Sequence, residues 1–290
     1  MEPDITYKKK SQALSIWRRF RRNRLAMFGL VVFLIIVLCA VFADVLADYE
    51  ELAITQNEDE RMLPPSGEHI FGTDNYGRDM FARIIHGARN SLTIGISSTL
   101  IALFFGCILG GLAAYYSGVV DNCIMRFLDM IACIPSILLA LTIVFALGAS
   151  LANLLTAITI AIIPGFTRVI RSAMLPIIGQ EFIEAARACG ATDLRILVRY
   201  IIPNAIGPIL VQGTMSVASL IMTAASLSFI GMGVQPPEPE WGSMLAEARE
   251  YIRYAPHMVI IPGMAIVLTA LSLNLIGDGL RDALDPRLKN

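Results

Sequence analysis

The feature that most constrains this chain is a set of long stretches without a charged side chain. Residues 25–43 form an uncharged run of 19, residues 90–120 one of 31, and residues 254–277 one of 24. Two more uncharged runs, 130–167 and 200–237, contain 38 residues each. A helix needs about 20 apolar residues to cross a bilayer core of ~30 Å. Only 16% of the residues are charged, against about a quarter in soluble domains, so the chain is predicted to be an integral membrane protein.

The runs predict an all-α protein with six transmembrane helices, because lipid offers no hydrogen-bond partner to an open strand edge. As one helix, the run 130–167 would be about 57 Å long, so we expect two spans with a turn near residues 148–153. The predicted parts are a basic tail 1–24, a first transmembrane helix 25–47, an external segment 48–88, a five-helix core 89–280 and a tail 281–290. The core helices are expected at about 91–117, 128–148, 151–168, 206–231 and 256–278, with a cytoplasmic loop at 171–204.

The distribution of Lys and Arg predicts the orientation. With six spans, 17 of the 23 basic residues fall on the side of the two termini and of the loop 171–204, Lys8, Lys9, Lys10, Arg287 and Lys289 among them. Basic residues favour the cytoplasm, so both termini are expected there. Residues 44–89 carry ten acidic residues against four Arg, which suits an external segment. The first apolar run is longer than the core of a signal peptide and follows a long basic region, so an uncleaved anchor is expected.

The residues that usually carry chemistry are scattered. The five cysteines have no Cys-x-x-Cys spacing and the three histidines lie far apart, which argues against a metal site. No Gly-x-x-x-x-Gly-Lys is present, so the chain lacks a phosphate-binding P-loop. The spans are nearly free of ionisable residues, which argues against a proton path. The net charge of −1 suggests no nucleic-acid partner. We expect no catalytic site and no cofactor here, so energy for uphill transport would come from a partner.

One charged stretch, "EAARACGATDLRILVRYIIPN" at 184–204, stands between two uncharged runs. It predicts a short helix, a turn at Gly190, a second helix and a restart at Pro203. In the second helix one face is expected to be apolar and the opposite face basic. The apolar face is formed by Leu194, Leu197, Val198 and Ile201, and the basic face by Arg195 and Arg199. Periodicity leaves two interpretations open, a helix lying on the lipid headgroups and a docking element for a partner.

The same stretch resembles the EAA loop of ABC importer permeases. Glu184, Ala185, Ala186 and Gly190 match that pattern, and Ile202-Pro203 stands where the family has Leu-Pro. The resemblance implies a coupling helix that sits in a groove of an ATPase subunit. The residues that it assigns to the coupling loop are Glu184, Ala185, Ala186, Arg187, Gly190, Ala191, Thr192, Asp193 and Arg195.

Three further blocks extend the resemblance over nearly the whole chain: "FGTDNYGRDMFARIIHGARNSL" (71–92), "ASLSFIGMGVQPPEPEWGSMLAEAR" (225–249) and "LNLIGDGLRDALDPRL" (273–288). They are similar to the second-permease (DppC/OppC) type of the dipeptide/oligopeptide/nickel subfamily. The external family motif consists of Gly72, Thr73, Asp74, Gly77, Arg78 and Asp79. Pro236, Pro237 and Trp241 are expected to face the binding protein, although Trp241 could equally anchor the chain at the membrane interface.

The resemblance implies a type I ABC importer (MetI-like) permease fold in the inner membrane of a prokaryote. It implies a related first permease as heterodimer partner, two cytoplasmic ATPase subunits that bind ATP, and an external solute-binding protein. The cargo stays open among dipeptides, oligopeptides, glutathione-like compounds and nickel. A self-sufficient carrier or channel and a membrane scaffold are the alternatives from other classes. Small polar residues of the fifth span share a face that we expect to serve packing rather than to line a pathway: Ser216, Ser219, Thr223 and Ser226.

Overall fold

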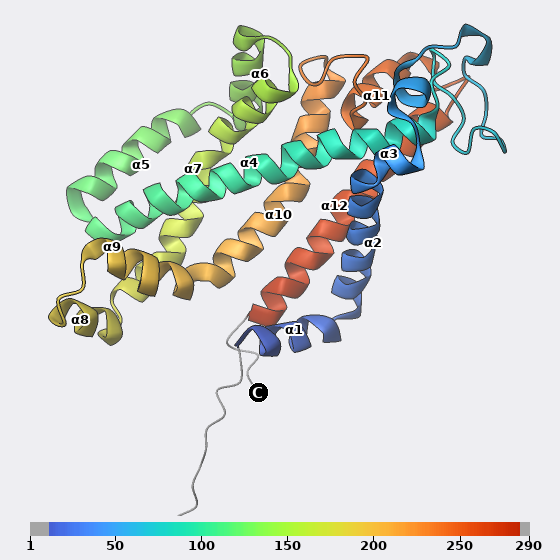
Figure 1. The fold of residues 1–290 in the computed structure, drawn as a ribbon. Helices are drawn as coiled ribbons and strands as arrows, with labels where there is room; N and C mark the ends of the chain where they lie inside the picture. Colours follow the sequence, from blue (N-terminus) through green and yellow to red (C-terminus); the bar gives the residue numbers. More distant parts are fainter. Residues whose placement is uncertain (1–11, 285–290) are drawn as a thin grey trace, which may run out of the picture.

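A computed structural model describes residues 12–284, and this part of the chain is almost entirely helical (Figure 1). The helices are α1 (Gln12–Arg22), α2 (Arg24–Val41), α3 (Ala43–Leu46), η1 (Tyr49–Ile54), η2 (Glu58–Glu60), α4 (Met80–Tyr116), α5 (Gly118–Ala132), α6 (Ser136–Leu147), α7 (Leu151–Ile178), α8 (Glu181–Ala188), α9 (Asp193–Ile196), η3 (Leu197–Ile201), α10 (Ile202–Phe229), α11 (Trp241–Ala248), η4 (Arg249–Tyr251) and α12 (His257–Leu284). The basic residues predicted at positions 8–10, 287 and 289 lie outside the described residues.

Five helices are long and apolar enough to cross a membrane, namely α2, α4, α7, the continuous stretch Asp193–Phe229, and α12. A sixth span is possible only if α5 and α6 count as one, and these two helices are bent by 76°. We expected one span at about 128–148, whereas the structure has two helices there, the end of α5 and the whole of α6. Pro135 lies at the bend and begins α6; its ring fixes φ and it has no N–H to continue the preceding helix.

Several helices exceed their predicted bounds. The helix α4 begins at Met80, eleven residues before the predicted span, and α7 continues to Ile178, ten residues beyond it. Both extensions contain polar residues, which a search for uncharged runs leaves out. The first eight residues of the loop predicted at 171–204 are therefore still part of α7.

The long helix α4 packs against α7, α10 and α2, and close helix contacts depend on glycine. A Cβ atom at Gly110 would lie 2.8 Å from the backbone oxygen of Thr167 and 3.1 Å from the backbone nitrogen of Arg171 in α7. Gly106 precedes it by four residues, so the two form a small-residue face of the kind that lets helices approach closely in membranes.

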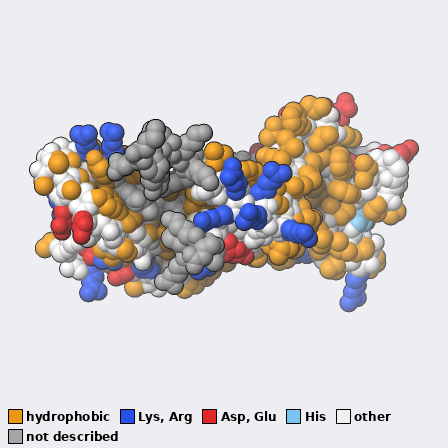
Figure 2. Space-filling view, turned by 90° about the horizontal axis from the view of Figure 1, so that it is seen from below, with side chains coloured by type: hydrophobic (Ala, Val, Ile, Leu, Met, Phe, Trp, Pro, Cys, Tyr) orange, Lys and Arg blue, Asp and Glu red, His pale blue; other side chains and the backbone are white. Residues whose placement is uncertain are grey.

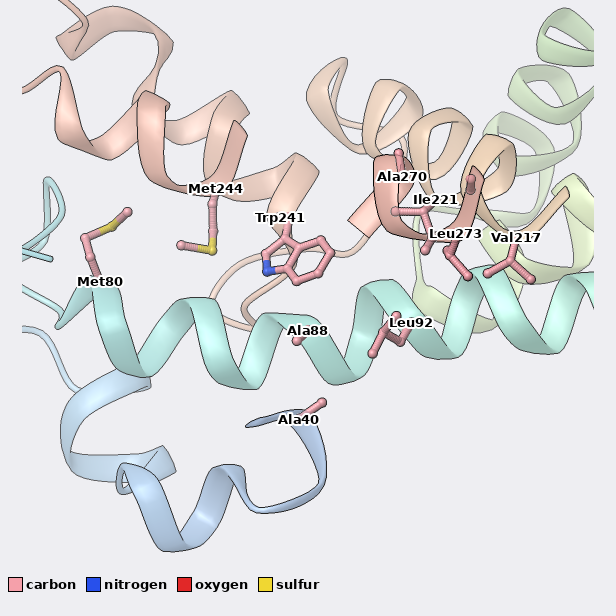
Figure 3. Close-up of a cluster of buried hydrophobic side chains, with 11 residues drawn as sticks. Ala40, Met80, Ala88, Leu92, Val217, Ile221, Trp241, Met244, Ala270 and Leu273 are labelled. Atoms are coloured by element: carbon pink, nitrogen blue, oxygen red, sulfur yellow. The ribbon is translucent and has the colours of Figure 1, made fainter. Parts of the chain in front are cut away.

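A hydrophobic cluster joins α2, α4, α10, α11 and α12 (Figure 3). Trp241 lies at its centre with 1% of its surface exposed, beside Met244, Ala88 and Leu92. Its indole Nε1 donates a hydrogen bond to the carbonyl oxygen of Ile84 at 3.0 Å. The predicted positions of Trp241, facing a binding protein or anchoring the interface, are therefore wrong, because the side chain is part of the core.

The two ends of the bundle carry different structures (Figure 1). The hairpin of α8 and α9 lies at one end with α1 and the end of α12. The short helix α11 and the segment that precedes α4 lie at the opposite end. This separation agrees with the predicted topology, in which the charged loop and the external segment are on opposite sides of the membrane.

Candidate functional site

The charged hairpin contains the helix, glycine and helix that its sequence predicts. Gly190 has a φ of +77°, a conformation that glycine adopts without a steric clash. The backbone N–H of Ala191 donates to the carbonyl of Ala186 at 3.1 Å and closes the end of α8. Thr192 begins α9, and its hydroxyl accepts a hydrogen bond from the backbone N–H of Arg195 at 3.4 Å.

The buried face of the second helix differs from the predicted one. Ile196 and Ile201 are fully buried, whereas Leu194 is 71% exposed and Val198 is 55% exposed. Ile201 belongs to the predicted face and is buried, but Ile196 takes the place of Leu194 because it packs in the same cluster as Ile183. Leu194 and Ile196 both precede the π-helical turn Leu197–Ile201. The predicted restart at Pro203 is also absent, since η3 continues directly into α10.

One face of the hairpin packs on the bundle and the other is free. Ile183 of α8 is fully buried in a cluster with residues of α4, α7, η3 and α10. On the free side, a hollow of about 360 Å³ is lined by residues of both helices: Phe182, Ala185, Ala186, Cys189, Ala191, Arg195 and Tyr200. Glu184 and Arg187 are exposed on α8. The residues predicted for the coupling loop thus come together on one short, structured element.

Two tyrosines at the end of α4 hold the hairpin. Tyr115 and Tyr116 donate hydrogen bonds to the two carboxylate oxygens of Asp193 at 2.7 Å and 3.2 Å. The guanidinium of Arg187 lies over the ring of Tyr115, 5.1 Å from its centre. Hydrogen bonds to an ionised acceptor are stronger than neutral ones, so α4 and the hairpin are fastened to each other. Both tyrosines lie at the end of the predicted span 91–117, and sequence reasoning missed their contact with Asp193.

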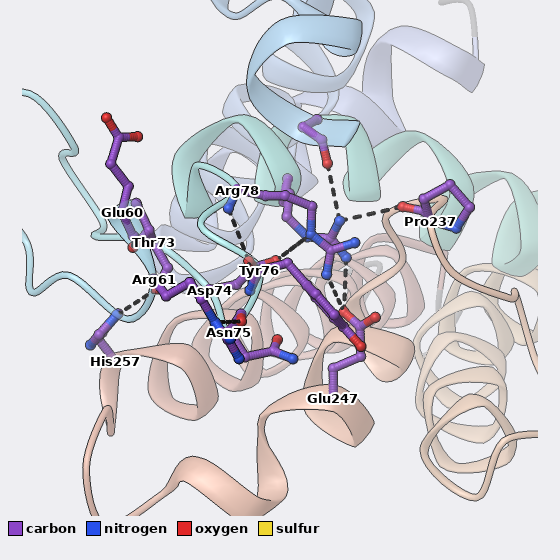
Figure 4. A network of polar contacts seen from close by, with 12 residues as sticks. Glu60, Arg61, Thr73, Asp74, Asn75, Tyr76, Arg78, Pro237, Glu247 and His257 are labelled. Carbon is purple, nitrogen blue, oxygen red and sulfur yellow. Dashed lines mark hydrogen bonds and ion pairs between the residues drawn. The ribbon is translucent and has the colours of Figure 1, made fainter. Parts of the chain in front are cut away.

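At the opposite end, the external motif builds a buried cluster of charges (Figure 4). Asp74 accepts a hydrogen bond from Arg78 Nε at 2.6 Å and lies 3.4 Å from Arg83 Nε. Glu247 of α11 accepts from both arginines, at 2.8 Å and 3.1 Å. The charges of the two arginines and the two carboxylates balance, and both arginines are only 1% exposed. Sequence reasoning missed Arg83 and Glu247, because Glu247 lies 169 positions from Arg78 along the chain.

The other motif residues shape the turn that begins α4. Asp79 caps the helix by accepting from the backbone N–H of Ala82 at 2.9 Å, and its second oxygen is 2.8 Å from His69 Nδ1. Thr73 is fully buried and its hydroxyl donates to the carbonyl of Glu60. At Gly77, with a φ of +77°, a Cβ atom would overlap the carbonyl of Asn57. Gly72 also has a positive φ, of 75°.

A second charge pair ties α2 and α3 to α4. Arg89 donates to both carboxylate oxygens of Asp44, at 3.0 Å and 2.8 Å, and to the carbonyl of Ala40. These hydrogen bonds lower the pKa of Asp44 below its ordinary value.

Pro236 and Pro237 are exposed near α11, and the carbonyl of Pro237 accepts a hydrogen bond from Arg83 at 3.3 Å.

A cleft of about 460 Å³ opens beside the bend between α5 and α6. Its walls come from the bend, from α7 and from α10. The residues that line it include Pro135, Ser136, Pro164, Gly165, Gln212, Ser216 and Ser219. Ser219 is exposed and Ser216 half-buried, so neither side chain is closely packed against another helix of this chain. Gln212 donates to the hydroxyl of Ser216 at 3.1 Å. Among residues 12–284 no group of His, Cys, Asp or Glu could hold a metal ion.

Comparison with known proteins gives two family matches. Residues 84–290 match the family described as "Binding-protein-dependent transport system inner membrane component". Residues 11–65 match the family described as "N-terminal TM domain of oligopeptide transport permease C".

Curated relatives align over nearly the full length. The dipeptide transport system permease protein DppC of Alkalihalophilus pseudofirmus is 45% identical over 284 residues, covering 96% of this chain and 92% of the relative. The di/tripeptide permease protein DppC of Pseudomonas aeruginosa is 43% identical, covering 100% and 96%. The glutathione permease protein GsiD of Escherichia coli is 45% identical, covering 94% and 90%.

A solved structure has the same fold. A chain of the inward-facing MetNI methionine ABC transporter superposes with a TM-score of 0.60 at 19% identity, covering 71% of this chain and 98% of the other. The predicted fold class, a helical permease fold of the MetI type, is confirmed by this likeness and by the family match.

Proposed function

The chain belongs to the family of binding-protein-dependent transport system inner membrane components, and from this premise we propose that it carries di- or oligopeptides as one permease of an ATP-driven importer. The family makes it a multi-pass membrane protein that works with an ATPase and a binding protein. In this proposal ATP is bound by two cytoplasmic partner subunits, and a related permease supplies the other half of the pathway. Both termini are cytoplasmic.

The observation that carries the proposal is the hairpin, which is free on one face and held on the other. Its outer face offers apolar side chains, Phe182, Leu194 and Val198, to a protein groove. Its inner face is joined to α10 by a continuous helix through η3 and to α4 by Asp193. A displacement of the hairpin by an ATPase subunit must therefore act on two spanning helices at once.

The cleft beside the α5–α6 bend is the proposed half-pathway. Its polar lining is uncharged apart from Arg168, which pairs with Asp129 at 2.8 Å. The hydroxyl of Ser219 donates to the carbonyl of Met215 in its own helix, and the amide of Gln212 donates to the hydroxyl of Ser216. Such a surface offers exchangeable hydrogen bonds without a fixed charge, which suits the passage of a zwitterionic peptide rather than its tight binding.

Two substitutions test the coupling role. Gly190→Pro removes the positive φ that the turn requires, and Glu184→Lys reverses an exposed charge on α8. In the assembled complex both should lower substrate-stimulated ATP hydrolysis and uptake, with assembly checked separately. The matched control for the charge reversal is Glu250→Lys, which reverses an exposed charge at the opposite end of the molecule and should leave both activities unchanged. Uptake that survives both hairpin changes would contradict the assignment.

A glutathione cargo is the second candidate, because a glutathione permease is as similar to this chain as the dipeptide permease, at 45% identity. The binding protein that delivers the cargo separates the two candidates. Its affinity for a set of dipeptides, longer peptides, glutathione and nickel should be measured by calorimetry, followed by competition for uptake in vesicles. Peptides should compete strongly; competition by glutathione alone would replace the peptide proposal.

A further inference from the structure

The helix α1 is amphipathic, and only part of its apolar face is used by the protein. Phe20 is 6% exposed and packs with Ile16 against α2 and α12. Leu14 and Trp17 are next to this contact, yet they are 58% and 48% exposed. Trp17 continues the packed face outward, whereas Leu14 shares the exposed side of the helix with Arg18 and Arg21, four and seven residues later.

The remainder of α1 is basic. Arg18, Arg21 and Arg22 are exposed, and Arg24 follows at the start of α2. No carboxylate among the described residues pairs with any of these four arginines. In the view from below, Lys and Arg side chains gather near the middle of the face, in the region of α1 (Figure 2).

The joint to α2 places this helix at the membrane boundary. Asn23 alone separates α1 from α2, and its side-chain oxygen caps α2 by accepting from Leu25 and Ala26 at 3.1 Å each. Asn23 also donates to Asp282 of α12 at 3.4 Å. Leu25 is 64% exposed, so the lipid-facing surface of α2 begins two residues after the joint. In Figure 1, α1 lies across the ends of α2 and α12 rather than in line with them.

We propose that α1 is an interfacial helix that binds anionic phospholipid headgroups. Trp17 enters the boundary of the acyl chains, where tryptophan is favoured. The four arginines, which pair with no carboxylate within residues 12–284, contact lipid phosphates, for which guanidinium groups are well suited. The occupant is a bilayer rather than a protein groove, because the free apolar side chains adjoin the lipid-facing surface of α2. Only the assignment of this end to the cytoplasmic leaflet rests on the proposed function.

Quenching of Trp17 by brominated lipids tests the proposal in the assembled transporter in vesicles. The chain has two tryptophans, and Trp241 is buried; the difference from a Trp17→Phe transporter isolates the signal of Trp17. Brominated phosphatidylglycerol in a phosphatidylcholine background should quench Trp17 more strongly than the reverse mixture. The preference should fall as ionic strength rises.

Charge removal should reduce that preference in steps. Each arginine close to an anionic surface contributes about 1 kcal/mol to the binding free energy, which is a factor of about five. Arg22→Gln should therefore lower the preference for anionic lipid up to about fivefold. The double change Arg18→Gln with Arg22→Gln should lower it further. Arg253→Gln removes an exposed charge at the other end of the molecule and should leave it unchanged.

Three results would overturn the proposal. If no brominated lipid quenches Trp17, this side chain does not lie in the bilayer. Equal quenching by both lipids means that the arginines do not select anionic headgroups. Quenching that appears only after the ATPase subunits are removed assigns this face to a protein partner. The measurement uses neither substrate nor nucleotide, so its failure leaves the transport proposal standing, and a transport failure leaves the lipid contact standing.

Discussion

At the scale of single residues, the polar contacts that matter join positions far apart in the sequence. Arg78 belongs to the predicted motif, but the roles of Arg83 and Glu247 become apparent only when α11 folds over the start of α4. Trp241 shows the same limit. Tryptophan is typical of both interfaces and cores, and only the packing of α11 on α4 decides between them.

Removing one member of the external charge cluster should destabilise the protein. Glu247→Gln leaves Arg78 and Arg83 with one carboxylate, and breaking a buried ion pair costs about 3–5 kcal/mol. Thermal unfolding of the full chain in detergent should shift to a clearly lower temperature. Glu250→Gln, an exposed position three residues later, is the control and should shift it little. Equal effects of the two changes would mean that the cluster does not stabilise the fold.

The contact of Asp193 with the tyrosines should affect coupling more than assembly. Asp193→Ala removes the acceptor of both hydroxyls, so hairpin motion should reach α4 less efficiently. We expect fewer peptides imported per ATP hydrolysed, by severalfold. The double change Tyr115→Phe with Tyr116→Phe should have a similar effect, and combining it with Asp193→Ala should add little, because the groups act as one unit. Glu181→Ala removes an exposed charge nearby and serves as the control; purely additive losses would contradict the link.

At the scale of elements, α4 connects the two sites. With 37 residues it is about 55 Å long, and it begins in the external charge cluster and ends at the tyrosines that hold the hairpin. The sequence predicts that a helix crosses here, because apolar length is a strong signal. Pro135 marks a place where a helix can bend, but the sequence predicts neither the 76° angle between α5 and α6 nor the π-helical turn η3. Both depend on local hydrogen bonding within stretches whose hydrophobicity is continuous.

Because α4 packs closely on α7, adding a single methyl group at Gly110 is expected to lower the stability of the protein. Gly110→Ala would bring Cβ to 2.8 Å from the backbone oxygen of Thr167, so the helices must separate. Overpacking of this kind costs about 1–3 kcal/mol and should lower the melting temperature of the full chain in detergent. Gly263→Ala in α12 adds the same methyl group where no atom lies within 4 Å. It should not lower the melting temperature; a loss as large as that at Gly110 would point to an effect of helix glycines in general.

At the scale of the whole molecule, the sequence predicts the architecture well and the surfaces poorly. Hydrophobic runs and the positions of Lys and Arg are summed over many residues, so they predict spans and the separation of the two ends reliably. Which face of the hairpin is free depends on the packing of Ile183 and Ile196 against α4, α7 and α10, which no average over a segment can detect. The surfaces offered to partners therefore come from the structure.

Labelling of Cys189 tests both the orientation and the partner surface. Cys189 is exposed and lines the hollow on the free face of the hairpin. With both termini cytoplasmic, a membrane-impermeant maleimide should label it in inverted vesicles but not in intact cells, and Glu68→Cys in the exposed external segment should show the reverse. A Cys189→Ser background identifies the signal, since Cys123 and Cys133 are also exposed. ATPase subunits that cover the hairpin should slow labelling of Cys189 at least tenfold and leave Glu68→Cys unaffected. Labelling of Cys189 from outside the cell would invert the proposed orientation, and labelling that ignores the ATPase subunits would place their contact elsewhere on this end of the molecule.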